Sequence, residues 1–197
     1  MTTMKSEITK TISFIILVMG CVHLLCAQPD KVYRSIKDVK DPSKVYILKL
    51  RWQRLKQIPP EVFTYTNLRE LDLSRNSIDT IPSEIAYLAN LEMLNLARNA
   101  IHYLPEEISL LPHLKTIDLS RNPVLELPES MGYMGSLESL VLWSTNLYCL
   151  PESFRELDAT LKELDLRSCQ LSITDQEAIE EMLPSVKKLW DQACNCR

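Results

Sequence analysis

From Val45 onward, apolar residues recur in one fixed phrase, L-x-x-L-x-L-x-x-N-x-I-x-x-I-P-x-x-I-x-x-L, in six copies. Within each copy, the central L-x-L alternates with polar positions, as Leu71 and Leu73 alternate with Glu70 and Asp72. This alternation predicts a short strand with one buried face. The copies begin 23 residues apart, with one spacing of 24, at Val45, Leu68, Leu91, Leu114, Leu137 and Leu161.

An asparagine position follows each predicted strand, where the chain has to turn. An Asn side chain can bond to backbone groups that a turn leaves unpaired, so these positions predict a stacked structural ladder. Cys169 falls at the last of them and is expected to be a free, inward-pointing thiol, with a disulfide as the alternative. The ladder runs through Gln53, Asn76, Asn99, Asn122, Thr145 and Cys169, and its last two substitutions predict a looser turn.

A proline recurs after each ladder position, usually followed by an acidic residue. Proline has no N–H for a sheet, and negative charge favours the start of a helical turn. Each copy therefore predicts a short helical or 3-10 return segment on the side opposite the strands. These prolines are Pro59, Pro82, Pro105, Pro128 and Pro151. Because no copy can bury its apolar face alone, the copies are expected to fold as one stack.

A fixed period in the twenties with this leucine placement is typical of leucine-rich repeats. Residues 45–189 closely resemble that family, in its subclass with 23-residue coils and an Ile/Leu-Pro step. The resemblance implies a curved α/β solenoid with parallel strands on its concave face and the returns on its convex face. It also implies that the concave face binds another protein. The junction Ala27-Gln28 and the segment from Val32 to Ile36 look like exported members from Bacteroidetes-type bacteria.

The segments that flank the repeats predict caps, because an open solenoid end exposes leucine. We assign residues 28–44 to an N-terminal cap, 45–171 to the repeats and 172–197 to a C-terminal cap. The stretch 31–41 reads as a short amphipathic helix whose apolar residues cover the first coil. Residues 174–177, Thr-Asp-Gln-Glu, read as a capping box that starts the C-terminal helix, followed by a final strand and a cysteine-containing tail.

Residues 1–27 read as a secretory signal peptide. Lys5 and Lys10 precede an apolar run that ends at Ala27, and this run is shorter than the roughly 20 residues that span a bilayer. Cleavage after Ala27 would give a secreted protein or one of the periplasm or cell envelope. An uncleaved membrane anchor and lipid attachment at Cys21 remain alternatives, since Val18 to Cys21 loosely resembles a lipobox.

Composition and the absence of known motifs exclude several classes of function. The net charge is −4, so a basic nucleic-acid-binding face is not expected, and three glycines cannot build a glycine-rich phosphate loop. No HExxH or GxSxG phrase occurs, and His102 and His113 fall at surface positions without a nucleophile beside them. We therefore expect no catalytic site, cofactor or metal. The pairing of Cys149, Cys194 and Cys196 stays open.

Two tryptophans and two neighbouring positions mark the predicted concave face. Trp143 and Val141 are apolar where sister copies carry Ser or Asp, which is typical of a binding hot spot, although Trp143 could instead stack on Arg167. Trp52 either belongs to the same surface or shields the capped end. Met93 lies on this face as well.

Arg75, Arg98 and Arg121 repeat just before the ladder and should line up in one row. Either Asp72 and Asp118 neutralise them, which is the interpretation we favour, or an acidic partner does. Along the face these two aspartates are separated by Asn95, which relieves like-charge contact. The predicted partner is another protein, with a glycan as the alternative, and a membrane contact is expected only through an uncleaved or lipidated N-terminus.

Overall fold

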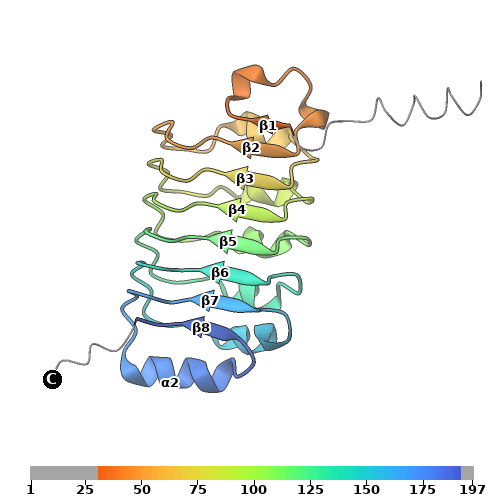
Figure 1. Cartoon of the computed structure of the whole chain (residues 1–197). Helices are drawn as coiled ribbons and strands as arrows, with labels where there is room; N and C mark the ends of the chain where they lie inside the picture. Colours follow the sequence, from red (N-terminus) through yellow and green to blue (C-terminus); the bar gives the residue numbers. More distant parts are fainter. Residues whose placement is uncertain (1–30, 192–197) are drawn as a thin grey trace, which may run out of the picture.

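The computed structural model describes residues 31–191, and these residues form one open parallel sheet of eight strands in sequence order (Figure 1). Each strand is only two or three residues long, and each pairs with its neighbours along the chain, the first and the last strand on one side only. The strands are β1 (Val32–Tyr33), β2 (Ile47–Lys49), β3 (Glu70–Asp72), β4 (Met93–Asn95), β5 (Thr116–Asp118), β6 (Ser139–Val141), β7 (Glu163–Asp165) and β8 (Lys187–Leu189).

The strand register follows the repeat. Leu48 pairs with Leu71, Leu71 with Leu94 and Leu94 with Ile117, so the same inward position is stacked coil upon coil. These side chains are buried in one continuous core with the leucines that flank them. The predicted solenoid is therefore confirmed, and it leaves the alternate strand positions on an outer surface, which we call the sheet face.

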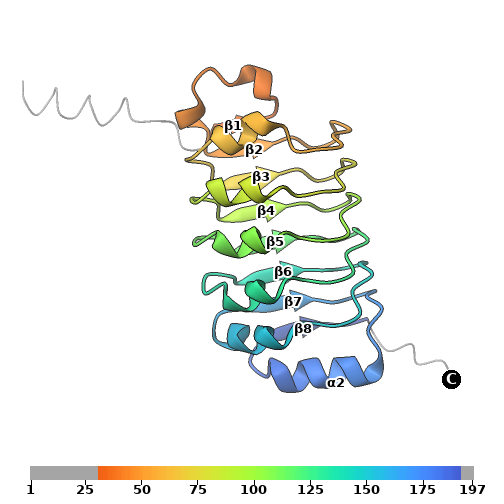
Figure 2. The ribbon, with the colours of Figure 1, turned by 180° about the vertical axis from the view of Figure 1, so that it is seen from behind.

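The returns are 3-10 helices on the other side of the core, which we call the return face (Figure 2). Each begins directly after one of the recurrent prolines, as expected for a segment that donates nothing to the sheet. They are η3 (Pro60–Thr64), η4 (Ser83–Tyr87), η5 (Glu106–Leu110), η6 (Glu129–Tyr133) and the longer η7 (Glu152–Ala159).

The asparagine ladder joins neighbouring coils through their backbones. The Asn76 amide nitrogen donates to the carbonyls of Leu73 and Leu50, at 2.7 and 2.8 Å, in its own coil and the one before. Its Oδ1 accepts from the N–H groups of Gln53 and Leu55. Asn99 and Asn122 repeat this pattern one and two coils later. One side chain thus satisfies backbone groups of two turns.

A second ladder, which the repeat phrase did not reveal, runs just before the strands. Asn67 and Asn90 each donate from Nδ2 to a backbone carbonyl of the preceding coil, both at 2.8 Å. Ser136 makes the corresponding bond to the carbonyl of Pro112 at 2.7 Å. Both ends of a strand are therefore tied to the coil before it.

The N-terminal cap differs from the helix expected over residues 31–41. The chain instead forms β1 and then two separate 3-10 turns, η1 (Ile36–Asp38) and η2 (Pro42–Lys44). Ser35 and Asp41 each accept a hydrogen bond from a nearby backbone N–H, so each starts its own short turn and no continuous helix forms. Ile36 and Val39 still pack against the core, as does the buried Tyr33 of β1.

At the other end, α2 (Ile173–Met182) is capped two residues earlier than expected. The capping box is formed by Ser172 and Asp175 rather than by Thr174 and Glu177. Lys188 is the middle residue of β8, where other coils place an aliphatic residue. Its side chain is buried, and its ammonium pairs with Glu180 of α2 at 2.9 Å. The predicted signal peptide and the tail with Cys194 and Cys196 lie outside the described residues.

Gly132 sets the closest approach between two returns. A Cβ at this position would lie 2.4 Å from the carbonyl carbon and oxygen of Ser153 in the next coil, whereas a Cβ at Gly135 would meet nothing within 4 Å. Gly132→Ala is therefore expected to destabilise the protein by about 1–3 kcal/mol in urea unfolding. Gly135→Ala is the matched control, and an equal loss from both variants would contradict this prediction.

Asn122 should be the most sensitive of the three ladder asparagines, because it alone among them is buried. Replacing it with Ala leaves the Ile101 N–H and the carbonyls of Leu96 and Leu119 without the partners they have now. We expect Asn122→Ala to cost about 2–4 kcal/mol of unfolding free energy, since each unsatisfied buried group costs about 1–3 kcal/mol. Asn146→Ala, at an exposed position, should stay within about 0.5 kcal/mol.

Candidate functional site

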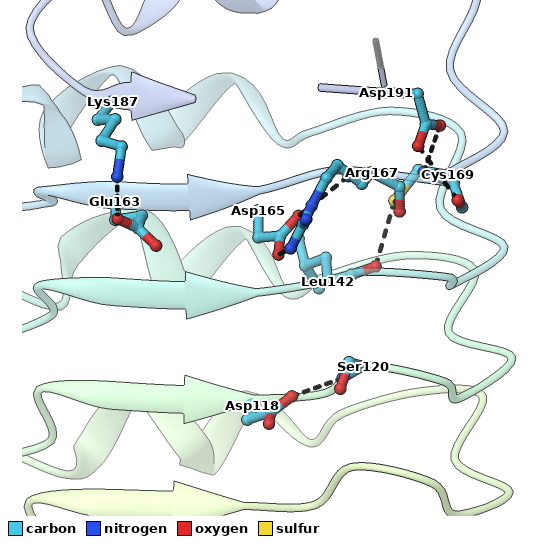
Figure 3. A network of polar contacts seen from close by, with 10 residues as sticks. Asp118, Ser120, Leu142, Glu163, Asp165, Arg167, Cys169, Lys187 and Asp191 are labelled. Carbon is cyan, nitrogen blue, oxygen red and sulfur yellow. Dashed lines mark hydrogen bonds and ion pairs between the residues drawn. The ribbon is translucent and has the colours of Figure 1, made fainter. Parts of the chain in front are cut away.

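The sheet face carries the predicted site residues, but the side chains of several of them form hydrogen bonds with their own backbone. Asp72, Asn95 and Asp118 each accept, through Oδ1, a hydrogen bond from the N–H two residues later, at 2.9–3.0 Å. Asp165 does the same for Arg167 at 3.2 Å (Figure 3). These side chains terminate their strands by an Asx-type turn. Val141 is apolar at the equivalent position of its coil and cannot make this bond.

Ion pairs neutralise most of the lysines and arginines on the strands. Lys115 pairs with Glu92 at 2.7 Å, and Lys162 pairs with Glu138 at the same distance two coils further on. The Lys115 ammonium donates a hydrogen bond to Glu92 and so lowers the pKa of that carboxyl. Further pairs join Lys49 to Glu70, Arg51 to Asp72, Arg167 to Asp165 and Lys187 to Glu163.

Trp143 stacks on an arginine, but not on the one expected. The Arg121 guanidinium lies 4.3 Å from the centre of the Trp143 ring. The predicted partner, Arg167, instead forms an ion pair with Asp165 at 2.6 Å within its own coil (Figure 3). A comparable contact holds Arg75 over the ring of Trp52 at 4.6 Å. Trp52 is 68% exposed, so much of its surface stays open to solvent rather than serving the capped end.

The three repeated arginines occupy a left-handed backbone position. Arg75, Arg98 and Arg121 have φ angles of 60°, 59° and 56°, and the equivalent residues Trp52, Ser144 and Ser168 share this conformation. Non-glycine residues seldom adopt it, so it is imposed by the turn that leads into the ladder. The favoured interpretation of the row is wrong: in the described chain, neither Asp72 nor Asp118 forms an ion pair with any of the three.

A shallow groove crosses the sheet face at its N-terminal half. It measures about 330 Å³ and is lined by Tyr46, Ile47, Arg69, Glu70, Glu92, Met93, Lys115 and Thr116. Met93 is its most exposed apolar side chain among the predicted residues, at 43%. The groove therefore combines apolar and charged lining residues. Its edge at Thr116 of β5 is one strand away from β6, which Trp143 follows, and Trp143 does not line it.

Cys169 replaces the ladder asparagine of its coil. Its thiol lies 3.2 Å from the carbonyl of Leu142, toward which it donates, and 3.3 Å from the Thr145 hydroxyl. Burial raises the pKa of this thiol. Among the described cysteines, Cys149 and Cys169 are both free, and Cys149 is exposed. Within residues 31–191 no group of His, Cys, Asp and Glu side chains is arranged to hold a metal.

The return face bears an apolar stripe that residue-by-residue inspection of the strands missed. Tyr87, Leu110 and Tyr133 stand 23 residues apart and are 64–72% exposed. A groove of about 460 Å³ lies beside the first of them and is lined by Phe63, Pro60 and Pro82 among others. The repeat period itself could have revealed this stripe, because all three residues occupy the same place in successive returns.

Comparison with known proteins agrees with this architecture. A family model described as a leucine-rich repeat matches residues 43–101 and 84–124, and a second of the same description matches residues 160–182. Together these matches span just over half of the chain, which belongs to the leucine-rich-repeat family. A search of curated proteins found no significant match.

Solved structures of similar fold come from bacteria and from a plant. A leucine-rich-repeat protein of Leptospira interrogans is 27% identical, with a TM-score of 0.68 over 83% of this chain and 47% of that one. An internalin of Listeria monocytogenes is 21% identical, with a TM-score of 0.65 over 75% of this chain and 41% of its own, and shows the fold alone.

The leucine-rich-repeat ectodomain of an Arabidopsis thaliana membrane receptor kinase is 28% identical, with a TM-score of 0.59. The match covers 66% of this chain and 16% of the ectodomain, whose structure was determined in complex with Casparian strip integrity factor 2. This chain thus spans less than half the length of each of these three proteins.

Proposed function

We propose that this protein is a non-enzymatic recognition module that binds another protein through its sheet face. The observation that carries the proposal is the exposure of Met93 and Trp52 on a surface where several neighbouring charged side chains are ion-paired. Exposed large apolar and aromatic side chains on a rigid face are typical of interface anchors. The receptor ectodomain of similar fold, which was solved in a complex, supports the same reading by analogy.

The dimensions of the sheet face suit a macromolecular partner. Eight strands at about 4.8 Å make a surface roughly 34 Å long, which is enough for the ~800 Å² that each partner buries in a standard interface. The ladders at both ends of the strands hold this surface rigid, so binding would order few side chains. A small-molecule pocket would instead require a deeper concavity than the shallow groove around Met93.

Binding can be located by a matched pair of charge insertions. Met93→Glu places a carboxylate on the sheet face, and Leu110→Glu does the same at an exposed position of the return face. With the protein immobilised and exposed to extracts of its source organism, we expect the partner's affinity to fall about tenfold or more for Met93→Glu, because an unpaired charge would be buried. Capture lost only with Leu110→Glu would move the site to the return face.

We also propose that the protein acts outside the cytoplasm after removal of residues 1–27. Support comes from the basic and apolar leader, and from one similar structure that is a receptor ectodomain. Among residues 31–191, no helix combines the length and the apolar character needed to cross a bilayer. Sequencing the mature N-terminus should give Gln28, whereas a lipid on Cys21 or an intact leader would favour an anchored cell-envelope scaffold.

A further inference from the structure

One row of like charge on the sheet side has no ion-pair partner among residues 31–191. Arg75, Arg98 and Arg121 share one backbone conformation, and each N–H donates to a carbonyl of the following coil at 2.8 Å. Consecutive members of this arginine row are therefore one strand spacing apart, about 4.8 Å between backbones. In the described chain none of the three forms an ion pair, whereas the Lys49, Arg51 and Lys115 side chains nearby all do.

Tryptophans occupy both ends of the arginine row. Arg75 lies over Trp52 and Arg121 over Trp143, at 4.6 and 4.3 Å. A guanidinium stacked on an aromatic ring keeps its N–H edge free for a planar anion. The stacking also draws the two outer arginines to the rings and leaves Arg98 between them, exposed and without an aromatic or acidic partner among the described residues.

Small side chains lie next to the arginine row. Ser74, Ala97 and Ser120 precede the three arginines, and both serines are nearly inaccessible to solvent. They stand where the first and fifth coils carry Arg51 and Trp143. Ser74 lies beneath the Arg51 side chain, whose Nε donates a hydrogen bond to its hydroxyl at 3.1 Å. Ala97, by contrast, is partly exposed, so no long side chain precedes the exposed Arg98 in its own coil.

We propose that the arginine row binds an acidic segment of the partner protein, with Arg98 making a bidentate contact to a carboxylate. This inference rests on the proposed function and specifies the partner's chemistry. An acidic segment has the charge opposite to that of the arginine row. Its carboxylates would reduce the repulsion among the three guanidinium groups, which have no ion-pair partner among the described residues. The carboxylates would come from Asp and Glu side chains or from a free C-terminus, which present the same planar group.

The test uses the full chain and three fluorescent peptides of equal length, measured by anisotropy. One is a glutamate repeat with an amidated C-terminus, one its glutamine counterpart, and one a Gly-Ser peptide with a free C-terminus. We expect the glutamate peptide to bind about tenfold more tightly than the glutamine peptide and to weaken as salt is raised. Tighter binding of the Gly-Ser acid than of the amidated glutamine peptide would instead assign the terminal carboxylate as the source.

Arg98→Asn removes the charge with a residue that tolerates the φ of 59°, so the fold should be kept. We expect it to weaken binding of the glutamate peptide about tenfold, with Arg98→Lys between this variant and the wild type. Arg54→Asn is the matched control, because Arg54 has a φ of 56° but lies outside the arginine row. Circular dichroism spectra and melting curves of all three variants would confirm that each is folded.

Equal affinity for glutamate and glutamine peptides, or an equal loss with Arg54→Asn, would overturn the acidic-partner proposal. That result leaves the proposed function standing if capture of the natural partner still depends on Met93. If Met93→Glu does not reduce capture of the natural partner, the proposed function is contradicted. That result does not contradict the proposal that the arginine row binds an acidic segment. The two ideas therefore fail by different measurements on different residues.

Discussion

At the turns that the asparagine ladder joins, backbone N–H and C=O groups face a neighbouring coil and must find partners there. A single asparagine side chain does this for two coils at once, as Asn76 shows with the carbonyls of Leu50 and Leu73. Because the same amide has to reach both turns, the number of residues from one strand to its turn cannot vary. The constant length of the strand-to-turn segment in each repeat follows from this hydrogen-bond geometry as much as from the leucine core.

The one spacing of 24 residues confirms where the chain has freedom. The extra residue falls between Pro151 and Leu161, within the return that contains η7, the longest 3-10 helix of the fold. The strand and turn of that coil keep their length, so β6 and β7 stay in register from Ser139 to Val141. Returns tolerate an insertion because their backbones contribute little to the sheet, whereas the strand-to-turn segment does not.

Much of the fold could be predicted from the sequence, since period-two alternation and the fixed proline identify strands and returns without knowledge of other coils. Contacts between coils could not. Trp143 has an arginine in each neighbouring coil, Arg121 before it and Arg167 after it, and the sequence does not distinguish them. The choice follows from the left-handed turn at Arg121 and from Asp165, which holds Arg167 in its own coil. The helix boundaries predicted for the two caps were wrong for a related reason. Single Ser and Asp side chains decide where short helical segments begin.

The sequence suggested too large a binding role for the polar strand positions and too small a role for the turn positions that follow them. Asp72, Asn95 and Asp118 look like a polar binding surface in the sequence, yet each has one oxygen committed to its own backbone. Met93, the tryptophans and the arginine row do not form such a bond with their side chains. The equivalent positions of other coils carry different residue types, and the coils still stack. In a solenoid of this kind, the positions available for recognition are therefore those whose side chains bond to nothing in the backbone, and a sequence reveals them only after the structural hydrogen bonds have been assigned.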